Sequence, residues 1–163
     1  MQVRPLGHDD LPALLPLIAD YQRFYGNGAP DDDHNAAFFG GFVAPSERGM
    51  LIGAYDEAGA LAGYTCLYWT YSSISATDVV LLNDLYVGPS HRGAGVGEAL
   101  IAAAREVAVQ RGCSHLRWAT TLDNRRAQRL YERTGADRET LFEYEFDLRH
   151  GLEPPSSITP RDR

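Results

Sequence analysis

The apolar residues in the first part of the chain repeat with helical spacing. One face of an α-helix would carry Leu11, Leu14, Leu15, Ile18 and Tyr21. Asp9 or Asp10 is suited to cap its first turn, where Pro12 is also tolerated. Pro16 interrupts the pattern, so we expect the helix to bend or restart there. The glycine- and proline-containing run 26–30 predicts its end.

A second pattern, typical of strands, follows the N-terminal region. Residues 50–55, 61–71 and 78–87 are rich in β-branched and aromatic residues, with turn residues between them. They predict three consecutive antiparallel strands. A short strand at 2–6 and a weaker helix at 31–43 are expected before them.

The remaining chain alternates between helical and strand patterns. It predicts a long helix at 95–111, a buried strand at 115–121 and a helix at 124–134. Segment 141–148 alternates strictly, which predicts a final strand. The aromatic face of that strand would carry Phe142, Tyr144 and Phe146.

Length and composition indicate one globular domain. The chain has 163 residues, 44% of them hydrophobic, enough for one substantial core. We expect a single α/β (α+β) domain over residues 1–148 and a polar, proline-containing tail over 149–163. Its sheet would be mixed but mostly antiparallel, with about six or seven strands flanked by about four helices.

The charge and the cysteine content exclude several classes of partner. A net charge of −7 disfavours nucleic acid and an anionic membrane surface, and it favours neutral or cationic substrates. Cys66 and Cys113 form no CxxC pair, and no histidine has a metal-ligand spacing, so no metal site is predicted. The sequence contains neither a targeting core nor a membrane-length apolar stretch, which predicts a cytoplasmic protein.

The most informative stretch is a strand that turns through glycines into a helix. The turn reads Arg92-Gly93-Ala94-Gly95-Val96-Gly97. Such a turn presents backbone N–H groups, and the helix N-terminus adds roughly half a positive charge, so it suits a phosphate. The spacing is neither that of a Walker loop nor that of a dinucleotide fingerprint. Tight helix–strand packing without a ligand is the alternative interpretation.

Two motifs resemble the GNAT superfamily of acetyl-CoA-dependent N-acetyltransferases. The signature of that family is Arg or Gln, two variable residues, Gly, one variable residue, and Gly or Ala. It is matched by Arg92, Gly95 and Gly97. A second family helix is matched by Asn124, Ala127, Tyr131 and Gly135. Two motifs about thirty residues apart are far more specific than one.

The resemblance implies a cofactor, acetyl-CoA, and a place for it. In this family the strands beside the loop splay apart, and the pantetheine arm pairs with backbone groups of residues such as Leu85 and Val87. The expected cofactor-binding set is Leu85, Tyr86, Val87, Arg92, Gly93, Ala94, Gly95, Val96, Gly97, Asn124, Ala127 and Tyr131. The resemblance also suggests a homodimer.

Candidate catalytic residues follow from the reaction that the resemblance implies, attack of a neutral amine on a thioester. Tyr131 is the candidate acid for the departing thiolate, because the family places this tyrosine near the sulfur and a phenol has a pKa of about 10. The alternative is that Tyr131 only fills the core. Asn124 is expected to contact the cofactor arm, to cap the helix, or to do both.

The base is less well defined by the sequence. Polyamine acetyltransferases carry Glu-Asp where this chain has Asn83-Asp84. Asp84 is either a functional carboxylate or a structural one satisfied by neighbouring donors. Because adjacent strand residues face opposite sides, Asp84 does not simply replace a base at position 83. Asn83 is a candidate to hold a water that relays the proton.

Aromatic residues and carboxylates suggest an acceptor site for an amine cation. The expected walls comprise Tyr21, Phe24, Tyr25, Asp31, Asp32 and Asp33 on one side and Tyr68, Trp69 and Tyr71 on the other. Core packing and helix capping are the alternative interpretations of these residues. The sequence therefore predicts acetylation of a small primary amine such as a polyamine, a diamine or an amino-acid-like compound. Alternatives are a protein lysine or N-terminal acetyltransferase, or a non-catalytic acyl-CoA sensor.

Overall fold

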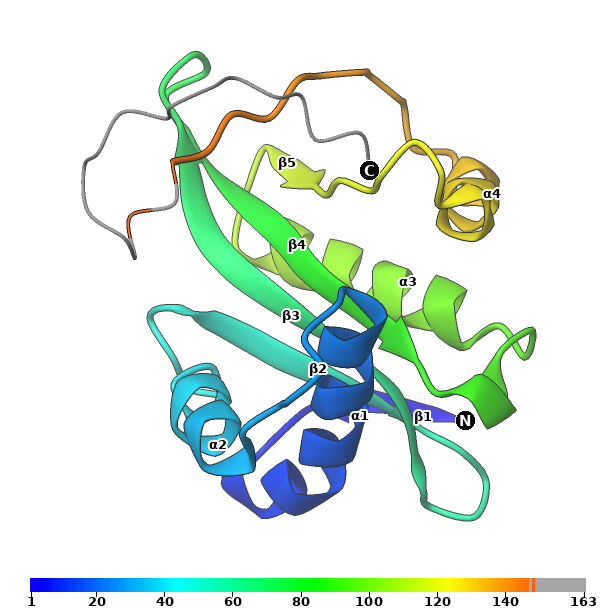
Figure 1. The fold of residues 1–163 in the computed structure, drawn as a ribbon. Coiled ribbons are helices and arrows are strands. Elements are labelled where there is room, and N and C mark those ends of the chain that lie inside the picture. Colours follow the sequence, from blue (N-terminus) through cyan, green and yellow to red (C-terminus); the bar gives the residue numbers. More distant parts are fainter. Residues whose placement is uncertain (147, 149–163) are drawn as a thin grey trace.

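A five-stranded mixed sheet forms the centre of the protein in a computed structural model that describes residues 1–146 and 148 (Figure 1). The strands are β1 (Gln2–Pro5), β2 (Gly49–Tyr55), β3 (Leu61–Ser72), β4 (Thr77–Val87) and β5 (His115–Arg117). They lie in sequence order. The first four are antiparallel neighbours, and β5 joins β4 in parallel. The predicted mixed, mostly antiparallel sheet is confirmed.

The described residues form four α-helices, three of which cover the two faces of this sheet. The helices are α1 (Leu11–Phe24), α2 (Asp32–Gly40), α3 (Val96–Gln110) and α4 (Arg125–Arg133). Figure 1 shows α3 behind the sheet and α1 and α2 in front of it. The core is divided accordingly: one cluster of buried side chains joins α3 to the sheet, and a second joins α1 and α2 to the opposite face. The α/β (α+β) class and the four helices match the expectation.

The sheet has fewer strands than expected because the C-terminal segment does not join it. Residues 141–146 form no strand, although their sequence alternates. Phe142 and Tyr144 are 88% and 90% exposed. The neighbouring edge strand, β5, is only three residues long and so offers few backbone groups for pairing. The tail predicted for 149–163 lies outside the described residues.

Helix α1 does not restart at the internal proline, which was one of the two outcomes expected there. It runs without a break from Leu11 to Phe24, with Pro16 inside it. Pro16 is close to the start of the helix, so it removes only the backbone hydrogen bond to the carbonyl of Pro12. Burial of Leu14 and Ile18 against the sheet stabilises the helix across this position.

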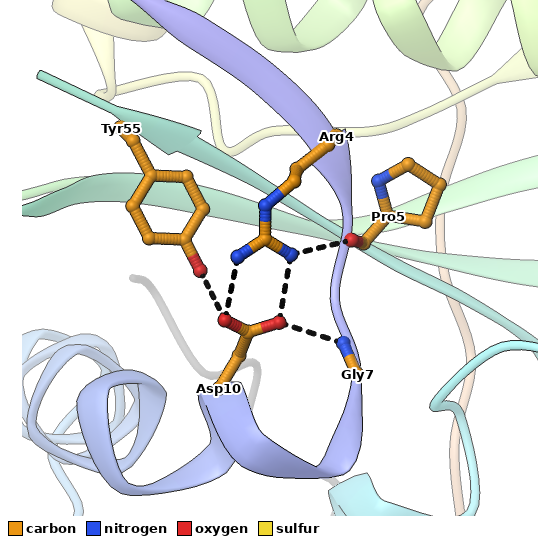
Figure 2. A network of polar contacts seen from close by, with 5 residues as sticks. All are labelled: Arg4, Pro5, Gly7, Asp10 and Tyr55. Carbon is orange, nitrogen blue, oxygen red and sulfur yellow. Dashed lines mark hydrogen bonds and ion pairs between the residues drawn. The ribbon is translucent and has the colours of Figure 1, made fainter. Parts of the chain in front are cut away.

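The carboxylate of Asp10 ties the start of α1 to the sheet rather than capping the helix. It accepts hydrogen bonds from Arg4 Nη1 and Nη2 at 2.8 and 2.7 Å, from the Gly7 backbone N–H at 2.7 Å and from the Tyr55 hydroxyl at 2.7 Å (Figure 2). Asp10 precedes the helix, yet its side chain makes no cap hydrogen bond. The Arg4 guanidinium and these donors hold the pKa of Asp10 far below its usual range. This network joins β1, β2 and α1.

Candidate active site

Strands β4 and β5 separate to open a cavity between them. They pair at only three positions, the last being Leu81 with Arg117. Beyond Leu81, β4 continues to Val87 while β5 ends, so the strands diverge as the resemblance implied. A cavity of about 440 Å³ lies there. Its β4 wall includes Leu82, Asn83, Leu85 and Val87.

The glycine-rich turn stands at one end of this cavity. Gly93 and Gly95 adopt φ angles of 85° and 79°, in the left-handed region that favours glycine. Helix α3 begins directly afterwards, at Val96. The N–H groups of a first helical turn have no partner within their own helix, so this end of the cavity offers donors and a positive dipole. The geometry is that of an anion site.

Arg92 is held in place beside this turn. Its Nε donates to the carbonyl of Val87 at 3.0 Å, and its guanidinium carbon lies 5.7 Å from the ring centre of Tyr86. The Val87 carbonyl, a predicted partner of the pantetheine arm, is therefore already engaged by the protein. The terminal nitrogens of Arg92 remain available at the cavity wall.

The cavity brings together most of the residues predicted to bind the cofactor. Its lining includes Leu85, Tyr86, Val87, Arg92, Gly93, Gly95, Val96, Gly97, Asn124, Ala127 and Tyr131. Ala94 is not part of that lining. Gly97 has a further packing role, since a Cβ at this position would lie 2.8 Å from a methyl group of Leu130 in α4. The third glycine of the motif thus also permits close approach of α3 and α4.

Asn124 and Tyr131 place α4 on the cavity wall. Asn124 Oδ1 accepts the backbone N–H of Ala127 at 3.2 Å, so this side chain caps α4 while it faces the cavity. The Tyr131 ring packs edge-on against Trp118, with ring centres 5.6 Å apart. Burial, with a smaller contribution from Tyr25, raises the pKa of Tyr131 to about 12. Both side chains combine a structural contact with access to the cavity.

A β-bulge sets the positions of Asn83 and Asp84. Cys66 pairs with Asp84 and the next residue of β3 pairs with Leu82, so Asn83 is an extra residue on β4. Asn83 is exposed and faces the cavity, whereas Asp84 is 5% exposed. Both meet side chains of the sheet face that α1 and α2 cover, Tyr68 and Tyr21 respectively, so the expected alternation of residues 83 and 84 fails at the bulge. The two remain linked, because Asn83 Nδ2 donates to Asp84 Oδ1 at 3.1 Å. The same amide nitrogen donates to the Tyr68 hydroxyl at 3.1 Å.

Asp84 is a buried carboxylate with a perturbed pKa. Burial raises its pKa to about 6, and hydrogen bonding by Tyr21 and Asn83 offsets part of that rise. The pKa of Tyr21 is itself raised, chiefly by burial and then by the charge of Asp84. Because Tyr21 also lines the cavity, it connects the carboxylate to the open space.

One of the two predicted acceptor walls is present in the cavity. Its α1 side is formed by Tyr21, Phe24 and Tyr25. On the other predicted wall, Trp69 instead donates its Nε1–H to the carbonyl of Ser46, and Tyr71 is 81% exposed beside a separate hollow. Asp31 caps α2 by accepting the backbone N–H of His34 at 3.0 Å. Packing accounts for Trp69 and capping for Asp31, while Tyr71 lies outside the cavity.

The sequence interpretation missed the basic character of the cavity. Although the chain has a net charge of −7, the charged lining consists of four arginines and one glutamate besides His91. The residues are Arg92, Arg126, Arg129, Arg133 and Glu98. The dense arginine run of α4 carried this signal, but a surface helix is commonly charged and the run was not interpreted. An anionic cofactor suits this wall.

His91, like the arginines of α4, was given no role from the sequence. Its Nε2 lies 3.0 Å from Asp56 Oδ2, and its Nδ1 lies 3.0 Å from the hydroxyl oxygen of Ser90. Asp56 belongs to the β2–β3 turn, so this pair fastens that turn to the glycine-rich segment. Its sequence signal was weak, because the partners are 35 residues apart.

The described residues contain neither a candidate metal cluster nor a membrane-spanning helix. Within 1–146 and 148, no three His, Cys, Asp or Glu side chains cluster in a way that could hold a metal ion. No helix of that part of the chain is long and apolar enough to cross a membrane.

Several proteins similar to this chain are named as acetyltransferases. An "Uncharacterized N-acetyltransferase YhfO" of Bacillus subtilis is 37% identical over 87% of this chain and 93% of its own length. A bovine thialysine N-epsilon-acetyltransferase is 41% identical, over 47% of this chain and 44% of its own length. The crystal structure of a probable acetyltransferase, 27% identical, superimposes with a TM-score of 0.80 over 91% of this chain and 98% of its own.

The family follows from a match over most of the chain. The model of the acetyltransferase (GNAT) family matches residues 14–136. The chain belongs to this family and is an enzyme of the N-acetyltransferase class. The acyl donor of the family is acetyl-CoA.

Proposed function

We propose that this enzyme transfers the acetyl group of acetyl-CoA directly to the primary amine of a small molecule. The observation that carries the proposal is the cavity between the diverging strands β4 and β5, which has the N-terminus of α3 at one end and Tyr131 and Asn83 on its walls. It offers an anion site and candidate proton-transfer groups within a single space.

The cofactor would lie along this cavity with its pyrophosphate at the glycine-rich turn. Gly93 and Gly95 leave open space where a side chain would otherwise project. The first N–H groups of α3 and the terminal nitrogens of Arg92 would then donate to the phosphate oxygens. The pantetheine arm would follow the unpaired edge of β4 from Val87 toward Asn83. This orientation brings the thioester toward Tyr131.

Tyr131 would donate a proton or a hydrogen bond to the departing sulfur. In the reaction the amine nitrogen bonds to the acetyl carbon, the carbon–sulfur bond breaks, and the sulfur takes up a proton. With a pKa of about 12, Tyr131 keeps its proton at neutral pH. Transfer of that proton to a thiolate whose thiol has a pKa of about 8.5 is uphill by about 5 kcal/mol. Hydrogen-bond donation in the transition state is therefore the favoured role, and the departing thiolate takes up its proton from solvent.

Asp84 would receive the proton that the amine loses. A pKa of about 6 keeps it mostly ionised at neutral pH yet more basic than an ordinary carboxylate. At 5% exposure it does not meet the amine directly, so the proton would travel through Tyr21 or through a water held by Asn83. The bulge supports this relay, because it places the amide of Asn83 within 3.1 Å of the carboxylate.

The acceptor would lie against the aromatic wall formed by Tyr21, Phe24 and Tyr25. Phe24 and Tyr25 are 65% and 50% exposed, and aromatic faces of this kind attract an alkylammonium group. The candidate acceptors are polyamines, diamines and amino-acid-like amines. The name of the bovine relative, a thialysine acetyltransferase, supports the last of these.

The test is release of CoA thiol from acetyl-CoA by the purified protein in the presence of single amines. The panel comprises polyamines, diamines, free amino acids, aminoglycosides and lysine peptides. We expect acceptor-dependent release with one small-amine class. Turnover with the peptides alone would replace the proposed acceptor by a protein. Cofactor binding without turnover across the panel would contradict the proposed small-molecule enzyme.

A further inference from the structure

The cavity face of α4 carries more positive charge than the pyrophosphate site needs. Arg126, Arg129 and Arg133 all line the cavity. They are three and four residues apart, a spacing that puts them on one side of a helix. Arg92 and the N-terminus of α3 already serve the proposed pyrophosphate position. The additional arginines therefore favour the binding of a second anionic group at this face.

Two of these arginines are uncommitted. Arg133 pairs with Glu98, the one acidic residue of the lining. Among the described residues, neither Arg126 nor Arg129 forms an ion pair or a side-chain hydrogen bond. Arg125, on a different side of α4, is not part of the lining and donates to Gln128. Free guanidinium groups thus gather on the cavity side of α4.

The contacts of α4 place this charge near the glycine-rich turn. Glu98 is in the first turn of α3, so its pairing with Arg133 brings the two helices together at that end. Leu130 reinforces the contact by packing over Gly97. Arg129 directly precedes Leu130, whereas the aromatic wall that would receive the acceptor belongs to α1. The part of α4 that carries Arg129 therefore lies against the first turn of α3, and Arg126 lies one helical turn before it on the same side.

We propose that Arg126 and Arg129 form a second anion site that binds the 3′-phosphate of CoA. This inference rests on the proposed function. CoA carries a phosphomonoester on its ribose in addition to the pyrophosphate, and at neutral pH that group bears nearly two negative charges. Guanidinium groups match phosphate oxygens with paired N–H donors. The site makes the enzyme select the 3′-phosphorylated cofactor over its dephosphorylated form.

The experiment compares calorimetric titrations of CoA and 3′-dephospho-CoA. The proteins are the wild type, the single variants Arg126→Ala and Arg129→Ala, the double variant, and the matched control Arg125→Ala. We expect the wild type to bind CoA roughly ten-fold or more tightly than dephospho-CoA, as charge-assisted hydrogen bonds imply. The double variant should lose that preference while keeping its affinity for dephospho-CoA. Arg125→Ala should keep the preference.

Each other outcome has a distinct meaning. Equal binding of both ligands by the wild type would overturn the second site and leave the proposed function intact. A preference that survives in the double variant, or an equal loss of affinity for both ligands, would also overturn it. If the wild type bound neither ligand, the proposed function itself would fail. Thermal unfolding of each variant verifies that it is folded, and the singles replace the double variant if that protein is unstable.

Discussion

Replacement of Asp84 by asparagine should change the pH dependence of stability in a defined way. The pKa of Asp84 rises from 3.8 to about 6 on folding because the carboxylate is buried. A raised carboxyl pKa means that the folded state binds this proton more tightly than the unfolded state. Its contribution to stability is therefore full below about pH 4 and is lost as the pH rises through about 6.

The magnitude follows from this shift. Between about pH 4.5 and pH 7 the wild type should lose about 2 kcal/mol of unfolding free energy through Asp84. Asp84→Asn removes that titration and preserves the shape of the side chain. All other ionisable groups are the same in both proteins, so their contributions cancel when the two are compared. The difference between the proteins thus isolates Asp84.

Urea denaturation at the two pH values measures the effect. The stability of Asp84→Asn relative to the wild type should rise by about 2 kcal/mol from pH 4.5 to pH 7. Asp78→Asn, an exposed change on the same strand, is the control and should show no such rise. A relative stability of Asp84→Asn that does not change with pH would refute the argument that burial perturbs this carboxylate.

The same variant tests the catalytic proposal. If Asp84 accepts the amine proton, Asp84→Asn should lower kcat by roughly ten-fold to a thousand-fold. The wild-type rate should fall as the pH drops through about 6, and the variant should lack that limb. Unchanged turnover together with the stability effect would make Asp84 a structural carboxylate.

Two further changes probe separate parts of the molecule. Tyr131→Phe should lower kcat by about ten-fold or more, measured by steady-state kinetics, while the affinity for acetyl-CoA, measured by calorimetry, stays within about three-fold. An unchanged kcat would mean that Tyr131 takes no part in the reaction. Asp10→Asn should lower the unfolding free energy by about 2 kcal/mol at neutral pH, because it disrupts the hydrogen bonds to Arg4, Gly7 and Tyr55. In the wild type the pKa of Asp10 is lowered by folding, so its contribution to the unfolding free energy is lost as the pH falls below about 4. Chemical denaturation of the wild type that shows no such loss would contradict this prediction.

Local patterns predicted the parts of the site that local forces determine. Helix α3 begins at Val96, only one residue later than expected. Its start could be predicted because the backbone conformation of Gly95 and the apolar repeat after it depend on neighbouring residues alone. Asn124 was expected to contact the cofactor arm or an ordered water, to cap α4, or to do both, and its side chain caps the helix at the cavity wall.

Features that depend on distant partners were beyond the sequence. The bulge at Asn83 arises where β4 pairs with Cys66 of β3, and no pattern within β4 signals it. The alternation rule put Asn83 and Asp84 on opposite sides, but the bulge breaks the alternation, and the two side chains lie on one side and share a hydrogen bond. The alternating segment 141–146 likewise satisfies the local rule for a strand, yet a strand needs a partner edge.

Titration of acetyl-CoA into the wild type, Gly95→Glu and Gly112→Glu tests whether the cofactor binds at the glycine-rich turn, on which the proposed function depends. Gly95 immediately precedes α3, and Gly112 lies just after its end. Both glycines have positive φ angles, 79° and 71°, and a side chain added at either would meet open space. The two changes therefore strain the backbone alike. We predict one-to-one binding by the wild type and by Gly112→Glu, and no measurable binding by Gly95→Glu, whose carboxylate would occupy the phosphate position. Undiminished affinity in folded Gly95→Glu, or no binding by the wild type, would contradict the central claim.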